Sequence, residues 1–350
     1  MSAWRDRHPG PYRVLVVDDS PLYRVRFAKL LGRSRDVVVS GVAADGEEAV
    51  RLIANNPPDV VLLDLSMPRM DGFAVLRWLA AHSPIPVVVC SSHNDRTSVF
   101  RALELGAVDF VPKPESAREA GRDLETLVLE RVLAAATAQL EPRRVSTAAV
   151  VLPTRERPAE VIAIGASTGG PAALQTLARA LPRELSAPIV VAQHMPQGFT
   201  RPFAERLGRH SHYTAAEAYD GARLGRATIH VAPGGMQTRI VAGPEMAQLA
   251  VVAGEPGEAH APSVDALFAS ASEVFGDATV AVVLTGMGDD GSAGAAAVKA
   301  RGGVVLVESS DTALIYGMPR AALATGRVDA ALPLSALPAA LLALTRASQG

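Results

Sequence analysis

The chain has 350 residues, of which 49% are hydrophobic, and its formal net charge at pH 7 is -2. This length allows two ordinary domains with separate cores, and a charge so close to zero argues against a nucleic-acid-binding protein. The single cysteine, Cys90, excludes an intrachain disulfide and a cysteine-based zinc site. The first residues lack an apolar signal core and no apolar run reaches ~18 residues, so we expect a cytoplasmic protein without direct membrane insertion.

Short apolar segments alternate with amphipathic helical patterns in the first third of the chain. The apolar segments are RVLVVDD, DVVVSGVA, DVVLLDL, IPVVVCSS and VDFVPKP, and helical periods such as EEAVRLIANN and GFAVLRWLAAH lie between them. Buried strands that alternate with helices predict a parallel sheet covered on both faces. Ligands of such sheets bind beyond the carboxyl ends of the strands, so we expect the functional residues there.

Charged and polar side chains stand at these strand ends. Asp18 and Asp19 close the first strand and Asp64 the third, while Ser91 ends the fourth and Lys113 follows the fifth. Converging carboxylates repel one another unless a cation lies among them, and hard oxygen ligands suit Mg²⁺. Aspartate is also a favoured helix N-cap, an interpretation that is equally good for any single one of them. For the whole set, together with a lysine, a cation site is the better interpretation.

Residues from about 12 to 115 resemble a response-regulator receiver domain, which has a flavodoxin-like (βα)5 fold. The resemblance rests on the acidic pair, the phosphoacceptor position, the hydroxyl residue, an aromatic residue and a Lys-Pro pair: Asp18-Asp19, Asp64, Ser91, Phe110 and Lys113-Pro114. It implies that Asp64 accepts a phosphoryl group and that Asp18, Asp19 and Asp64 hold Mg²⁺. It also implies that Ser91 and Lys113 support the phosphoryl group.

A helical pattern, SAREAGRDLETLVLERVLAAATAQL, follows the fifth strand and completes the first domain. The next segment is rich in Pro, Arg, Ser and Thr and has no sustained period, which is typical of an exposed linker. We therefore expect a receiver domain over residues 12–130, an interdomain linker over 131–158 and a second domain over 159–347.

Strand and helix patterns alternate again in the second half. VIAIG, PIVVAQ, TVAVVLT and GGVVLVE are candidates for buried strands, and TIHVAP, TRIVAG and QLAVVAG for shorter ones. The pattern predicts an α/β domain with a doubly wound, mostly parallel sheet and a local β-hairpin.

A serine stands at the first strand-to-helix junction of this half. In residues 165–170 an apolar strand runs into a glycine-rich turn, and a helix with Pro171 in its first turn follows. This arrangement holds the hydroxyl of Ser167 at a helix N-terminus, where backbone N–H groups and the helix dipole favour negative charge. The geometry suits either a nucleophile or a phosphate cradle, and the short G-x-S-x-G pattern does not separate the two.

A serine nucleophile needs a base, and the base needs a group that orients it. His194, just past the strand PIVVAQ, is the best candidate base. His260 lies in a loop and remains an alternative, whereas His230 lies within a strand and is more consistent with a core histidine. Asp289 and Asp290, at another strand end, are the candidates for the orienting carboxylate.

The same acidic loop permits a different interpretation. Residues 286–291 match G-x-G-x-x-G, and Glu308 ends the next strand, as in a dinucleotide-binding fold. Asp289 and Asp290 would place two like charges against the pyrophosphate, which weakens this interpretation but leaves it open.

Residues from about 159 to 347 resemble the catalytic domain of the chemotaxis protein-glutamate methylesterases, the CheB family. The matching stretches are IGASTGG, QHMPQGFTRPFAERL, HAPSVDALF, LTGMGDDG and YGMPRAA. The resemblance implies Ser167 as nucleophile, His194 as base and Asp290 as the orienting group. The motif register alone favours Asp290 over Asp289.

The resemblance also implies that the backbone N–H of Met287 belongs to the oxyanion hole. The backbone N–H of Thr168, the residue directly after Ser167, is the second candidate donor. The resemblance implies an ester hydrolase that demethylates glutamate methyl esters on chemoreceptors, with deamidation of receptor glutamines open as a second activity and no cofactor for the esterase step. The implied partners are a CheA-type histidine kinase and the methylated cytoplasmic domains of chemoreceptors, with phosphorylation of Asp64 activating the enzyme. The alternative is a non-catalytic, phosphorylation-dependent regulator that docks on receptors.

Overall fold

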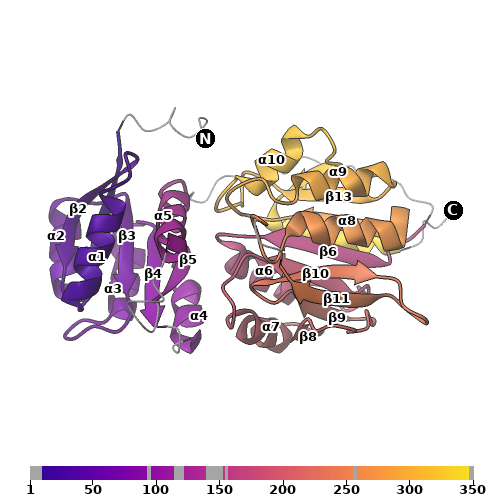
Figure 1. Ribbon diagram of the computed structural model, residues 1–350, viewed down its shortest axis with the longest axis horizontal. Coiled ribbons are helices and arrows are strands. Elements are labelled where there is room, and N and C mark those ends of the chain that lie inside the picture. The colour runs from indigo at the N-terminus through magenta and orange to yellow at the C-terminus, as the bar shows by residue number, and fades with distance from the viewer. Residues whose placement is uncertain are drawn as a thin grey trace. The chain divides into compact units, whose positions relative to one another are not determined.

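The computed structural model describes residues 10–92, 96–113, 122–138, 153, 157–254 and 258–346. The chain divides into two compact units, Met1–Glu141 and Pro142–Gly350. Each unit is an α/β structure around its own parallel sheet (Figure 1). Pro114 of the receiver-like pattern and most of the expected linker lie outside the described residues.

The described part of the first unit contains a parallel sheet with strand order β2-β1-β3-β4-β5. The strands are β1 (Tyr12–Val17), β2 (Val37–Ala43), β3 (Val60–Asp64), β4 (Val87–Ser92) and β5 (Asp109–Lys113). Every residue of β3 is buried, because a parallel sheet has helices on both faces. This is the flavodoxin-like strand order, and it confirms the predicted fold class of this half.

Five helices accompany this sheet in the described residues. They are α1 (Pro21–Leu31), α2 (Gly46–Asn55), α3 (Gly72–His82), α4 (Arg96–Glu104) and α5 (Arg122–Ala136). The side chains of Asp45 and Asp71 cap α2 and α3, accepting hydrogen bonds from backbone N–H groups at 2.8 and 2.7 Å. Capping thus accounts for these two aspartates, and α5 continues past residue 130 to Ala136.

The second unit is built on a parallel sheet with strand order β14-β13-β12-β6-β7-β9-β8. The strands are β6 (Val161–Ala166), β7 (Ile189–Gln193), β8 (Thr214–Glu217), β9 (Thr228–Val231), β12 (Thr279–Val283), β13 (Val304–Glu308) and β14 (Ala330–Leu332). The chain passes from β6 to β7 on one side and later returns to β12 on the other. The carboxyl end of β6 is therefore a topological switch point, the place where such sheets bind ligands.

The predicted β-hairpin is confirmed as the antiparallel pair β10 (Met236–Val241) and β11 (Gln248–Ala253). The helices of this unit are α6 (Gly170–Ala180), α7 (Thr200–Arg209), α8 (Val264–Phe275), α9 (Ser292–Ala300), α10 (Met318–Ala324) and α11 (Leu337–Leu344). Helix α8 packs against α9, β10 and β6 (Figure 1). Among the described residues, no helix combines the length and apolarity needed to cross a membrane.

The packing of α8 on β6 brings the start of this helix to the switch point. Val264, Leu267 and Phe268 of α8 are fully buried in the core beneath it, and burial of each such side chain contributes ~1.5–3 kcal/mol. A Cβ at Gly165 would lie 2.8 Å from a methyl group of Val264, too close for any larger residue. This glycine allows the first turn of α8 to lie directly on the end of β6.

Candidate active site

Ser167 follows β6 directly and is 5% exposed. Its backbone N–H donates to the Thr285 carbonyl at 3.0 Å, and its own carbonyl accepts from the Gly170 N–H at 2.8 Å. Gly169 has a φ of +79°, a conformation that favours glycine, and it turns the chain into α6. The predicted strand–turn–helix arrangement around the serine is thus present.

His194 lies beside Ser167 because their strands are neighbours in register. The last pair of β6 and β7 is Ala166 with Gln193, so Ser167 and His194 both follow at the same level. The His194 N–H donates to the Ala166 carbonyl at 2.9 Å, which continues the pairing one step beyond the sheet. The structure therefore brings these two predicted residues together.

Asp290 comes to the same point from the other side of β6. Its Oδ2 lies 2.8 Å from Nε2 of His194. The carboxylate also accepts from the backbone N–H groups of Val264 at 2.8 Å and Asp265 at 2.9 Å, in the first turn of α8. The start of α8 thus provides a site for a buried negative charge.

The surroundings of Asp290 keep this carboxyl ionised. Burial would raise its pKa, but hydrogen bonds from His194 and from the Val264 and Asp265 N–H groups lower the pKa to about 2. In the neutral tautomer of the His194 ring that donates to this acceptor, the hydrogen is on Nε2 and the other ring nitrogen, Nδ1, carries the lone pair.

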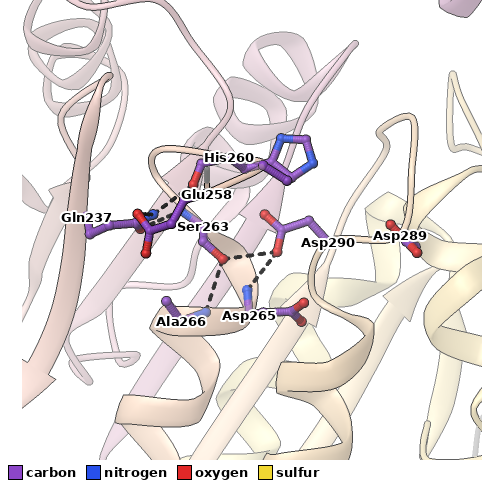
Figure 2. A pocket seen from close by; sticks show the side chains of 9 residues that line it. Gln237, Glu258, His260, Ser263, Asp265, Ala266, Asp289 and Asp290 are labelled. Carbon is purple, nitrogen blue, oxygen red and sulfur yellow. Dashed lines mark hydrogen bonds between the residues drawn. The ribbon is translucent and has the colours of Figure 1, made fainter. Parts of the chain in front are cut away.

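Asp289, the neighbouring candidate, is exposed and lies apart from Asp290 (Figure 2). The loop between these residues and α9 is held by Asp265. One oxygen of its carboxylate accepts from the N–H groups of Gly291 at 2.9 Å and Gly294 at 2.6 Å. Asp290 therefore accepts hydrogen bonds from the N-terminus of α8, and Asp265 of α8 accepts them from the N-terminus of α9.

The predicted oxyanion-hole residues flank the serine. Thr168 is buried directly after Ser167, and its carbonyl accepts from the Thr285 hydroxyl at 2.9 Å. A Cβ at Gly286 would lie 2.8 Å from the Cβ of Ser167, so this glycine allows the backbone before Met287 to pass close to the serine. The Met287 side chain is 38% exposed.

His260, the alternative base, occupies a different position. Its ring stacks on that of His194, with centroids 4.4 Å apart and planes 15° from parallel. It is the stacking partner of His194, whereas the hydrogen bond to Asp290 belongs to His194 itself. A cavity of about 240 Å³ opens beside this stack, lined by His260, Ser263, Asp289 and Asp290 among others (Figure 2). His230 is buried in β9.

Glu308 rules out the dinucleotide interpretation. Its side chain is 1% exposed, and one carboxyl oxygen accepts from the Thr285 N–H at 2.9 Å. A carboxylate enclosed in this way is unavailable to a ribose. Burial raises the pKa of Glu308 to about 7, although hydrogen bonds from the Thr285 N–H and the Thr312 hydroxyl lower it.

This buried acid makes the stability of the second unit depend on pH. Between pH 4.5 and 7 folded Glu308 retains a proton that the unfolded chain releases, so the free energy of unfolding falls by about 3 kcal/mol over that range. Glu308→Gln removes this contribution. We expect urea unfolding, followed by circular dichroism, to give a difference between wild type and Glu308→Gln that changes with pH in this window. Parallel stability curves from pH 4.5 to 8 contradict the prediction.

The acidic residues of the first unit also meet at one sheet edge. Oxygen atoms of Asp18, Asp19 and Asp64 lie within 4.8 Å of one another. The ammonium of Lys113 lies 2.7 Å from both Asp18 and Asp64. Ser91, near the end of β4, is buried. The expected residues of a receiver site thus converge.

The charges in this cluster fit a divalent cation. Asp18 and Asp64 are buried and Asp19 is exposed. Burial raises the pKa values of Asp18 and Asp64, and Lys113 offsets this only in part. Three carboxylates face a single ammonium, and an oxygen-ligated cation with access from the Asp19 side would balance them.

The fold and these contacts define a two-unit α/β protein with a serine-hydrolase-like site in one unit and a phosphoreceiver-like site in the other. The family model for the CheB methylesterase matches residues 162–341, and the model for the response regulator receiver domain matches residues 14–123. The chain belongs to the CheB methylesterase family of hydrolases, with a receiver domain ahead of the catalytic domain.

Individual relatives are similar in sequence over nearly the whole chain. "Protein-glutamate methylesterase/protein-glutamine glutaminase 6" of Anaeromyxobacter dehalogenans is 49% identical, covering 95% of this chain and 96% of the relative. "Protein-glutamate methylesterase/protein-glutamine glutaminase 3" of Geobacter sulfurreducens is 43% identical, covering 91% and 93%. The crystal structure of the Thermotoga maritima CheB methylesterase catalytic domain has a TM-score of 0.52 at 37% identity, covering 53% of this chain and 98% of that one.

Three residues make contacts at the site that the sequence did not predict. They are Gln193, whose amide contacts the serine loop, Asp265, which holds the acidic loop, and His260, which stacks on His194. A polar residue that ends an otherwise apolar strand just before the base was a usable signal for Gln193. Asp265, in the first turn of a helical pattern, resembled an ordinary helix-start acid.

Proposed function

We propose that this protein is a phosphorylation-activated esterase that removes methyl groups from glutamate methyl esters on chemoreceptors. The observation that carries the proposal is the buried Asp290–His194 hydrogen bond beside Ser167, at the switch point of the sheet. The names of the relatives from Anaeromyxobacter and Geobacter support glutamate methyl ester as the substrate. We assign residues 12–130 to the receiver domain, 131–158 to the linker and 159–347 to the catalytic domain.

In the proposed first step, Nδ1 of His194 takes the proton of the Ser167 hydroxyl while the serine oxygen attacks the ester carbonyl. The backbone N–H groups of Thr168 and Met287 stabilise the oxyanion of the tetrahedral intermediate. Asp290 holds the imidazole ring and stabilises the positive charge that develops on it. His194 then returns the proton to the leaving oxygen, and methanol departs.

In the second step a water molecule attacks the acyl-enzyme, with His194 again as the base. The bond between Ser167 and the acyl group breaks, and glutamate is released with the serine restored. No cofactor takes part in this scheme.

A receptor glutamine is the second substrate that the same residues suit. The tetrahedral intermediate of an amide carries the same oxyanion, and His194 protonates the departing nitrogen so that ammonia leaves. The relatives' names pair a methylesterase with a glutaminase, which supports this second activity.

In this proposal the receiver domain regulates the esterase activity. We propose that a CheA-type histidine kinase phosphorylates Asp64 in the cytoplasm, with Mg²⁺ held by Asp18, Asp19 and Asp64. Mg²⁺ would neutralise oxygens of the transferring phosphoryl group, and Lys113 and Ser91 would bind it after transfer. Phosphorylation then shifts the population toward a form in which Ser167 is accessible.

The test is the release of methanol from methylated receptor membranes by the full chain. With Mg²⁺ and a small-molecule phosphodonor such as acetyl phosphate, we expect a rise in rate within the ~5- to 150-fold range of typical allosteric coupling. Asp64→Asn should keep the basal rate and lose this rise, because it lacks the phosphoacceptor carboxylate. Removal of Mg²⁺ with EDTA should have the same effect.

Asp71→Asn is the matched control, since Asp71 caps α3 in the same unit and asparagine caps equally well. It should respond to the phosphodonor like the wild type. Full activation of Asp64→Asn contradicts the proposed control. A chain that binds receptors and releases no methanol, with or without phosphodonor, supports the docking regulator instead.

A further inference from the structure

Gln193, the last residue of β7, joins the serine loop to the histidine loop through its side chain. It is 1% exposed. Its amide nitrogen donates to the carbonyl of Ser167 at 2.9 Å and to the carbonyl of His194 at 3.1 Å. One rigid amide group therefore contacts the backbone of both residues.

The chemistry of the two partners determines how this amide is oriented. Both are carbonyl oxygens, which only accept, so the nitrogen of Gln193 must face them. Its oxygen then points the other way, where it has no hydrogen-bond partner among the described residues. Leaving a buried polar atom unpaired is unfavourable. A residue that served packing alone would not need an amide here.

The first turn of α6 leaves room for the Gln193 side chain. A Cβ at Gly170 would collide with the Gln193 side-chain oxygen, so the first turn of α6 accommodates the amide only because residue 170 is glycine. The Ser167 carbonyl, which Gly170 also contacts, accepts two hydrogen bonds, one from the backbone and one from Gln193.

We propose that Gln193 is a positioning residue that holds Ser167 and His194 at the separation needed for proton transfer. Backbone hydrogen bonds tie each residue to the sheet: Ser167 through the Thr285 carbonyl and His194 through the Ala166 carbonyl. The carbonyl groups of Ser167 and His194 lie just beyond the ends of β6 and β7, and the Gln193 amide donates a hydrogen bond to each of them. This inference rests on the proposed roles of Ser167 and His194.

Two substitutions in the full chain test it, with methanol release in the presence of phosphodonor as the readout. Gln193→Met keeps the shape but donates no hydrogen bond, and it should lower kcat by ~10- to 100-fold, the range expected for a small misplacement of reacting groups. KM should change by less than about threefold, because no receptor contact is lost. Gln175 is a buried glutamine of α6, and Gln175→Met should stay within about twofold of wild type.

Gln193→Glu provides a readout that a purely structural role would not affect. An ionised carboxylate would face two carbonyl oxygens, whereas a protonated one can donate to one of them. Burial raises the pKa of such a carboxyl into an accessible range. The rate of Gln193→Glu relative to wild type should therefore rise by about tenfold between pH 8 and pH 6, while Gln175→Glu shows no such rise.

Wild-type kcat in Gln193→Met, or a pH-independent relative rate in Gln193→Glu, overturns the proposal. If Gln193→Met does not fold, as judged by circular dichroism, the pH dependence of Gln193→Glu decides. If wild type releases no methanol, the proposed function fails. The rate at which a fluorophosphonate labels Ser167 in wild type and Gln193→Met then tests the role of Gln193. This labelling reaction requires the serine and its base but no receptor.

Discussion

Ser167→Ala is expected to lower the rate of methanol release from methylated receptors by about 10⁶-fold, as loss of the nucleophile does in serine proteases. The effect is large because, in the proposed mechanism, the serine forms the covalent intermediate, and neither His194 nor the proposed oxyanion hole can replace its oxygen. Phosphorylation of Asp64 should be unchanged, since this residue belongs to the other unit. Radiolabelled methanol release and phosphorylation with a labelled donor measure the two.

Ser272→Ala is the matched control for this prediction. Ser272 is a fully buried serine of α8 whose hydroxyl donates to the Ala269 carbonyl within the helix. It should retain activity and fluorophosphonate labelling, and Ser167→Ala should lose both. Methanol release by Ser167→Ala near the wild-type rate would show that another residue is the nucleophile.

Asp290→Asn is expected to lower turnover by about 10⁴-fold, the loss seen when a serine triad loses its carboxylate. An amide cannot hold His194 in the required tautomer as a carboxylate does, nor stabilise its positive charge. Its NH₂ group would also face one of the N–H groups that now donate to Asp290, and two donors cannot form a hydrogen bond. Initial rates with saturating receptor measure the effect.

Asp289→Asn separates the role of Asp290 from the general charge of the loop. Asp289 is exposed and adjacent in sequence, so this substitution removes the same charge from the same loop. We expect a rate within about twofold of wild type. If Asp289→Asn is the more damaging of the two, the assignment of Asp290 by motif register and by its contact with His194 is wrong.

The strand pattern of this protein was largely predictable because its sheets are parallel. Strands covered on both faces are apolar throughout, and segments such as VVLLD and TVAVV contrast sharply with the amphipathic helices between them. The two strands without such a signal, β8 and β14, are short edge strands of the sheet. An edge strand of three or four residues needs no long apolar run.

The site was predictable where a residue type and a strand end coincide. Ser167, His194 and the Asp289-Asp290 pair each follow an apolar strand, so their meeting at one sheet edge was expected. The choice between the two aspartates had no local basis, because both occupy the same loop in the same charge context. The role of His260 was hidden for a similar reason, since its ring stacks on a residue that is distant in the sequence.

Apolar periodicity and the residues at strand ends are properties of neighbouring positions, and so the amino-acid order alone indicates two parallel-sheet domains, an acidic phosphoreceiver cluster and a serine at a helix start. Which aspartate faces His194 is decided by the packing of α8 on β6, which brings backbone donors to Asp290 and leaves Asp289 exposed. Glu308, at the end of β13, is enclosed elsewhere in the unit, where it accepts a hydrogen bond from the Thr285 N–H, and this removes it as a ribose ligand. Burial and hydrogen-bond partners come from segments far apart in the chain, and only folding brings them together.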